Sequence, residues 1–245
     1  MISFLGLCIQ NFIQTLKYIF SGNVKWKPIL SQAAMISYDS LPIALSIVFI
    51  AAVVISLQVS KQFLMTGAEA YVGGFLAVAL IRELAPGFAA LAISARAGTA
   101  ISAEIANMQV TSQVDAIKTL KVDPVGYYFA PRIISGAITV PMVVILAELF
   151  GILGGLIVSY YTIDLHPNRY MTSVYQWINT RDIYISLLKG FVFGILIPLV
   201  CATQGYTTTG GAKGVGISTT KAAIKATVFL LMADLLITFL FYIDL

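Results

Sequence analysis

The sequence predicts an all-α membrane protein, built from an N-terminal helix at the membrane surface and five transmembrane helices. Of its 245 residues, 59% are hydrophobic and only 11% are charged, whereas soluble domains carry roughly 25% charged residues. Five apolar stretches are long enough to cross a bilayer core of about 30 Å. No internal repeat recurs along the chain, so we expect a single membrane domain over residues 1–245.

The first predicted element is a helix over residues 3–20. Its apolar residues recur at helical spacing, while Gln10, Gln14 and Lys17 form a polar face, and this pattern favours the membrane surface over the interior. A short first span is the alternative, but it would place those polar groups in lipid. The predicted transmembrane helices follow at residues 42–59, 72–95, 133–161, 183–201 and 222–242.

Five spans place the chain ends on opposite sides of the membrane, and the Lys and Arg residues predict the orientation. With a cytoplasmic N-terminus, ten of them fall on the cytoplasmic side and three or four on the other. The net charge of +4 therefore reports loop orientation, and we expect no nucleic-acid partner. The ten are Lys17, Lys25, Lys27, Arg96, Lys118, Lys121, Arg132, Lys213, Lys221 and Lys225; the others are Lys61, Arg169, Arg181 and, if it lies outside its span, Lys189.

The segment between the second and third spans, residues 98–123, is too polar to cross the membrane and too regular to be a plain loop. Ile105, Met108, Val114 and Ile117 recur at helical spacing, which predicts one amphipathic helix or two short ones on the cytoplasmic face. Such a helix either rests on the membrane surface or docks by its apolar side into a groove of a soluble partner. Periodicity alone does not separate these two interpretations.

The residue patterns indicate neither an active site nor a metal site. The glycine-rich stretch at 204–216 fails the phosphate-loop pattern, because Gly211 and Ala212 stand where lysine and a hydroxyl residue are needed. It is predicted to be a flexible or closely packed turn. Cys8, Cys201 and the single His166 have no partners at metal-ligand spacing. We expect no catalytic residue, metal or cofactor in this chain, and any ATP hydrolysis in a partner subunit.

The stretch LIRELAPG, residues 80–87, places two charges and a proline inside the second predicted span. An ionisable residue in a membrane costs at least about 2.5 to 3.5 kcal/mol on insertion scales, so Arg82 and Glu83 each need a partner or a water-lined cavity. As helix neighbours they point about 100° apart and do not pair with each other. Pro86 removes a backbone hydrogen bond to the Arg82 carbonyl, and Gly87 leaves room for close helix approach.

Longer motifs give a resemblance to a known family. From Arg82 to Arg132, the run RELAPGFAALAISARAGTAISAEIANMQVTSQVDAIKTLKVDPVGYYFAPR is similar to the signature of the MlaE/YrbE family, the permease subunits of ABC transporters that move phospholipids between membranes. The later run GVGISTTKAA resembles the last cytoplasmic loop of that family. The resemblance implies a homodimeric permease, cytoplasmic or stromal ABC ATPase subunits, and a partner with a substrate-binding MCE domain.

The resemblance also implies that residues 103–121 form the coupling helix, which transmits closure of the ATPase to the spans. Asn107, Gln109 and Ser112 depart from the family pattern, so specific ion pairs to the ATPase are left open while the docking is still expected. The residues that match the pattern are Glu104, Met108, Val110, Thr111, Gln113 and Asp115.

For a lipid carrier, the predicted substrate path consists of Arg82, Glu83, Pro86 and Gly87. A bilayer lipid needs an apolar cavity with a few polar groups at one end, and these charges can supply them. The alternative is that both charges form buried pairs that hold the spans together without touching substrate.

Two other functions fit parts of the sequence. An ion- or proton-coupled secondary transporter would use Arg82, Glu83, Glu148 and Asp234 as its coupling site and would work without an ATPase. A membrane scaffold would transport nothing. Otherwise we expect Glu148 and Asp234 to serve packing. The resemblance implies a bacterial inner membrane or the chloroplast inner envelope, with the N-terminus on the cytoplasmic or stromal side. The lack of an evident targeting segment fits either a bacterial or a plastid-encoded protein, and the short chain with its Ile, Phe, Tyr and Lys usage favours the second.

Overall fold

The computed structural model describes residues 2–22 and 24–243, and within these ranges every regular element is a helix. Five helical segments are long and apolar enough to cross a membrane, so the predicted all-α membrane class is confirmed. Each segment is longer than its predicted apolar stretch, because helix formation continues into the polar regions beyond the bilayer core. The five are Trp26–Met65, Glu69–Val110, Pro124–Ile163, Thr180–Tyr206 and Gly211–Tyr242.

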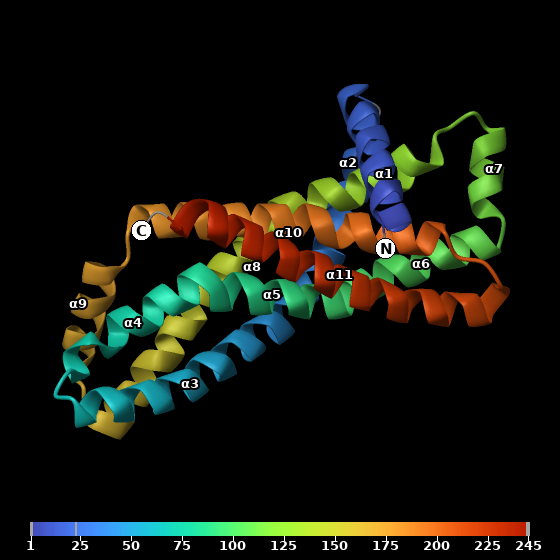
Figure 1. Cartoon of the computed structure of the whole chain (residues 1–245). Helices are drawn as coiled ribbons and strands as arrows, with labels where there is room; N and C mark the ends of the chain where they lie inside the picture. Colours follow the sequence, from blue (N-terminus) through green and yellow to red (C-terminus); the bar gives the residue numbers. More distant parts are fainter. Residues whose placement is uncertain (1, 23, 244–245) are drawn as a thin grey trace.

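The long helices run along the molecule, and the end of the last helix lies far from the N-terminal helix (Figure 1). One end carries α7 (Gln113–Thr119), and the opposite end carries α9 (Pro167–Trp177) and the end of the last helix. The helix α10 (Thr180–Tyr206) is central, since 67% of its apolar window is buried inside the chain, against 17% for α11 (Gly211–Tyr242). Much of α11 is therefore left for lipid or another chain to cover.

A close helix crossing joins α8 (Pro124–Ile163) to α10. A Cβ atom added at Gly136 would collide with the carbonyl oxygen of Gly194, and a Cβ atom at Gly194 would collide with that of Gly136. Small residues allow helix backbones to approach in this way. Further along α8, a Cβ atom at Gly155 would collide with the side chain of Leu76. Glycine thus sets the distances between the central helices.

The N-terminal helix α1 (Ile2–Phe20) lies across the long helices instead of along them (Figure 1). Asn11 and Thr15 are buried against the bundle, and Asn11 Nδ2 donates to Thr203 Oγ1 at 3.1 Å. Ile9 and Phe20 stay exposed, as a helix at the membrane surface requires for its lipid-facing side. Of the polar residues that a first span would place in lipid, Gln14 donates to Asp123 Oδ1 at 2.7 Å, while Gln10 and Lys17 are exposed.

The second long segment corrects the prediction of a span at 72–95 followed by a separate helix at 103–121. The helix continues to Val110, and the break comes at Ser112, whose φ of 59° is left-handed. Residues 103–110 thus extend the span, and only α7 is separate. Periodicity cannot locate such a break, because both parts repeat at helical spacing. The continuous elements are α4 (Val72–Ala79), η3 (Leu80–Leu84), α5 (Ala85–Ile93), η4 (Ser94–Gly98) and α6 (Thr99–Val110).

The glycine-rich stretch at 204–216 is mostly helical, because it holds the end of α10, a short turn and the start of α11. Residues 207–210 alone separate α10 from α11, and Gly210 and Gly211 take φ values of +89° and +64°, which glycine adopts without strain. A Cβ atom at Gly214 would collide with the carbonyl of Thr209. The turn is thus closely packed where Gly214 meets Thr209, while residues 209–213 are exposed.

We predict that Gly194→Ala lowers the stability of the folded chain by about 1–3 kcal/mol, the usual cost of overpacking, because the new Cβ meets the backbone of Gly136. Thermal unfolding of the purified protein in detergent measures the change. Gly216→Ala in α11 is the matched control, since its added Cβ would have no described atom within 4 Å. Equal melting temperatures for the two variants would show that the crossing is looser than described.

Candidate functional site

The charged pair of the second long segment lies in a π turn. The turn η3 holds Arg82 and Glu83, and Pro86 follows as the second residue of α5. Proline has no N–H to donate to the Arg82 carbonyl, and its ring clashes with the carbonyl four residues earlier. A wider turn before the proline relieves that clash, and single π turns within α-helices occur frequently at functional sites.

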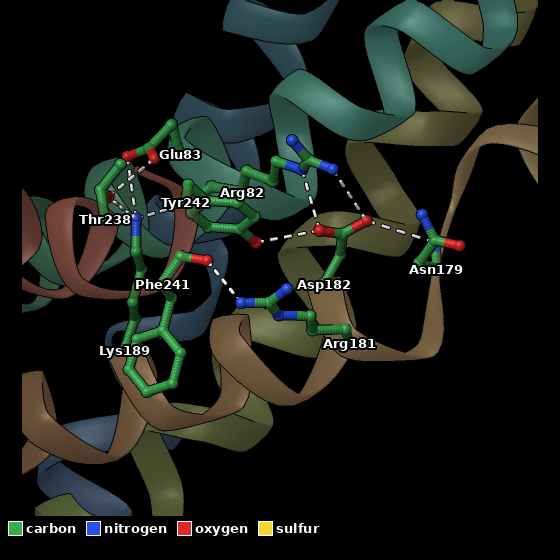
Figure 2. A network of polar contacts seen from close by, with 9 residues as sticks. All are labelled: Arg82, Glu83, Asn179, Arg181, Asp182, Lys189, Thr238, Phe241 and Tyr242. Atoms are coloured by element: carbon green, nitrogen blue, oxygen red, sulfur yellow. Dashed lines mark hydrogen bonds and ion pairs between the residues drawn. The ribbon is translucent and has the colours of Figure 1, made fainter. Parts of the chain in front are cut away.

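Arg82 pairs with Asp182 near the start of α10 (Figure 2). Arg82 Nε lies 2.9 Å from Asp182 Oδ1, and Nη2 lies 3.3 Å from Oδ2, a two-pronged geometry that adds strength and direction. The Tyr242 hydroxyl donates to Asp182 Oδ1 at 3.0 Å, and the guanidinium lies 4.6 Å from the centre of the Tyr242 ring. Asp182 also accepts from the backbone N–H of Asn179 at 3.2 Å. Several donors thus surround this buried carboxylate.

Glu83 pairs with Lys189, whose side chain is fully buried in α10 (Figure 2). Lys189 Nζ donates to Glu83 Oε2 at 2.9 Å, to the Arg82 carbonyl at 2.7 Å and to Thr238 Oγ1 at 2.8 Å. These bonds use all three protons of the ammonium group. Asp234 Oδ1, 2.7 Å from Nζ, therefore contributes as an ion pair without hydrogen-bond geometry. The Arg82 carbonyl, which cannot accept a hydrogen bond from Pro86, thus accepts one from the Lys189 ammonium group.

Each of the two ion pairs has one buried and one accessible member. The side chains of Asp182 and Lys189 are 3% and 0% exposed, while those of Arg82 and Glu83 are 30% and 41% exposed. Gly87 lies one helical turn beyond Glu83, and a Cβ there would have no described atom within 4 Å. A molecule in the membrane, or a second chain, can therefore reach Arg82, Glu83 and Gly87.

Pro86 differs from the other predicted path residues, because it is buried and acts through the helix geometry. Of the two acidic residues expected to serve packing, Glu148 lies apart and accepts from the Ser186 hydroxyl. Asp234 instead joins the Lys189 cluster.

The sequence-based reasoning missed most of this network's partners. The charge count leaves open whether Lys189 lies outside its span, although a cation inside an apolar run indicates a buried partner. Asp182 follows Asn179 by three residues, and this spacing predicts a capping pair at the start of a helix. It does not indicate that Asp182 also pairs with Arg82. Thr238 and Tyr242 carry no signal in the sequence, because nothing in the pattern of α11 specifies which face meets α10.

The predicted coupling residues divide into two groups. Thr111, Gln113 and Asp115 are exposed around the turn between α6 and α7, and Val110 is half-buried. Glu104 and Met108 instead line a cavity inside this end of the molecule, where Arg132 Nη2 donates to Glu104 Oε2 at 2.6 Å. The two inward residues therefore contact neighbouring helices of their own chain.

The helix α7 projects at one end of the molecule (Figure 1), with Val114 buried against the bundle and most of its other residues exposed. Its surface pair, Lys118 Nζ and Asp115 Oδ1, is 2.9 Å apart, and this hydrogen bond raises the pKa of the Lys118 ammonium group. Leu120, just after the helix, is 73% exposed. A projecting helix with an exposed apolar residue beside charged ones has the character of a docking element.

Comparison with known proteins shows that this chain is similar to permeases of ABC transporters. The sequence profile of the family described as Permease MlaE matches residues 29–240. A probable ABC transporter permease protein of Rickettsia prowazekii is 37% identical over 214 residues, which are 87% of this chain and 83% of that protein. One from Synechocystis is 34% identical over 229 residues, 94% and 87% of the two chains. The chloroplastic protein TRIGALACTOSYLDIACYLGLYCEROL 1 of Arabidopsis thaliana is 31% identical over 229 residues, 94% and 65% of the two.

The membrane helices together with these matches define the class: a permease subunit of an ABC transporter, which has no enzymatic role of its own. The chain belongs to the MlaE permease family. The resemblance seen in the motif from Arg82 to Arg132 is thereby confirmed. Family membership favours the permease over the ion-coupled transporter and the scaffold.

We predict that Lys189→Met destabilises the protein by about 3–5 kcal/mol, the usual cost of removing one partner of a buried ion pair. The substitution leaves Glu83 and Asp234 without their cation. Combining it with Asp234→Asn should recover part of the loss, because residues in one network couple by about 0.5–3 kcal/mol.

Thermal unfolding in detergent measures both variants. Lys61→Met, at an exposed lysine near the end of α3 (Leu41–Met65), controls for the loss of a positive charge. If Lys189→Met and Lys61→Met melted at the same temperature, the network would not contribute to the stability of the fold.

Proposed function

We propose that two copies of this chain form the membrane-spanning core of a transporter that moves a phospholipid or related glycerolipid between membranes. ATP hydrolysis in separate ABC ATPase subunits would drive the movement, and a partner with an MCE domain would exchange lipid at the α9 end. Membership in the MlaE permease family supports this proposal. So does the similarity to a relative whose name is that of a glycerolipid.

The observation that carries the proposal is the accessible side of the charged network. Arg82 and Glu83 are held in place by Asp182 and Lys189, yet both remain partly exposed within an apolar span. A lipid head needs polar groups that are already oriented, and its acyl chains need apolar surface beside them. Gly87 leaves space on this face, and a second copy placed against it would enclose a cavity.

The opposite end supplies the proposed contact with the ATPase. Thr111, Gln113 and Asp115 are exposed there, on or beside the projecting helix α7. Lysines at 118, 121, 213 and 221 lie near the same end of the chain's helices, and the positive-inside rule supports a cytoplasmic or stromal side for this end. The proposed membrane is a bacterial inner membrane or the chloroplast inner envelope.

We predict that Gly87→Leu reduces lipid transfer at least tenfold, which corresponds to about 1.4 kcal/mol, and leaves the fold intact. The larger side chain fills the proposed path but meets no described atom of its own chain within 4 Å of its Cβ. Transfer of labelled lipid by the reconstituted complex gives the rate, and thermal unfolding checks the fold.

Gly87→Ala is the matched control, because a methyl group adds little bulk and removes the same glycine. Glu83→Gln tests the polar part, since it keeps the shape of the side chain but removes its charge, and we expect slower transfer. Wild-type transfer by both Gly87→Leu and Glu83→Gln would exclude this face from the substrate path.

We predict that Asp115→Arg weakens binding of the ATPase subunits and lowers lipid-stimulated ATP hydrolysis, because it reverses a charge on the exposed face of α7. Lys118→Ala is the control, since both changes remove the Asp115–Lys118 pair but only the first reverses an acidic charge. Co-purification and ATPase assays measure the effect. Undiminished co-purification of Asp115→Arg would place the ATPase contact elsewhere.

A further inference from the structure

A cavity of about 200 Å³ lies at the α7 end of the molecule. It is enclosed by the end of α1, by α2 (Trp26–Ala33), by α6 and by the start of α8. Glu104, in its wall, follows Glu83 along one helical rod, so the cavity is about 30 Å from the charged network at 1.5 Å per residue. It is therefore a separate site.

Two buried polar atoms in the cavity wall have no hydrogen-bond partner within the described part of the chain. Arg132 is 4% exposed, and its Nη1 and Nη2 donate to the Tyr128 carbonyl and to Glu104 Oε2, both at 2.6 Å. Its Nε–H donates to no described acceptor, and Gln32 Oε1 accepts from no described donor. Unpaired buried polar groups are costly and rare. The cavity thus fits a molecule that accepts from the arginine and donates to the amide.

The charges of the wall define the class of ligand. Arg132 pairs with Glu104, so Lys25 gives the residues that line the cavity one net positive charge. A guanidinium group suits phosphate, whose oxygens accept several hydrogen bonds at once. A hydroxyl group next to the phosphate can donate to Gln32 Oε1. These features describe an anionic phosphate that carries a hydroxyl-bearing head.

The surroundings favour a lipid over a soluble phosphate. Tyr127 and Tyr128 line the cavity, and Tyr127 is 45% exposed; aromatic residues gather at the level of lipid headgroups. We propose that the cavity binds the phosphate headgroup of an anionic membrane lipid from the leaflet at the α7 end. Its acyl chains would leave the cavity past Tyr127.

This site would connect the lipid to the coupling segment. Glu104 and Met108 line the cavity, and the same helix leads through Val110 to the turn before α7. A bound headgroup would therefore hold α2, α6 and α8 together at the base of α7. The inference does not rest on the proposed lipid transfer, because a resident lipid can occupy this site whatever the permease carries.

The test uses the permease with its ATPase subunits, purified in detergent and depleted of lipid. Short-chain phosphatidylglycerol, short-chain phosphatidylcholine and glycerol 3-phosphate are added in separate titrations, followed by native mass spectrometry and thermal unfolding. We expect phosphatidylglycerol to bind and to raise the melting temperature, and the other two to do neither.

The variant Lys25→Ala/Gln32→Leu should bind phosphatidylglycerol at least tenfold more weakly, about 1.4 kcal/mol. It should still fold, because Lys25 is exposed and Gln32→Leu removes an unpaired buried atom. Lys27→Ala is the matched control: Lys27 is exposed and close in sequence but does not line the cavity, so it should keep wild-type affinity.

Four results would overturn the proposal. No effect of phosphatidylglycerol would indicate a cavity filled by water. Equal stabilisation by phosphatidylcholine would remove the need for an anion, and equal stabilisation by glycerol 3-phosphate would identify a soluble phosphate as the ligand. If Lys27→Ala lost as much affinity for phosphatidylglycerol, binding would depend on the general positive charge of the surface and not on the cavity. Because the readout is binding, each failure is distinct from failure of the Gly87 variants in lipid transfer.

Discussion

The structure depends on one constraint: each charge inside the membrane-spanning bundle must find a partner of opposite charge or a hydrogen-bonding group. Lys189 meets this constraint completely, since its fully buried ammonium group donates to Glu83, Thr238 and a backbone carbonyl. Water cannot solvate these groups in a bilayer core, so the protein must do so. Lys189 on α10 consequently holds η3 and α11 in one arrangement, because its three acceptors lie on those two elements.

Proline and glycine make that arrangement possible. Pro86 prevents regular α-helical bonding around Arg82, and the π turn before it lets two adjacent charges reach different partners on α10. At the crossing of α8 and α10, Gly136 and Gly194 bring the backbones together. A polar network in a membrane protein thus requires both the charged residues and the small or irregular ones that position them.

The two proposed sites of action lie on one helical rod. The segment Glu69–Val110 has 42 residues and is about 60 Å long at 1.5 Å per residue. It carries η3 and the charged network toward one end and leads into α7 at the other. A displacement of α7 by a partner subunit can therefore reach the network through a packed helix, and the two π turns, η3 and η4, are the places where such a helix bends most readily.

The sequence by itself determined the all-α membrane class, the number of spans and the family, because hydropathy and long motifs are local properties of the chain. It also determined that Arg82 and Glu83 needed partners, since their cost in a membrane is independent of the fold. Only the tertiary structure decided which partners these were. Asp182, Lys189, Asp234 and Tyr242 come from distant parts of the chain, and their meeting depends on the rotation of each helix about its axis. The same reason applies to the coupling segment. Glu104 and Met108 match the family pattern, yet they line a cavity. Which side of α6 is covered depends on how that helix packs against α2 and α8, and the sequence pattern does not contain this information.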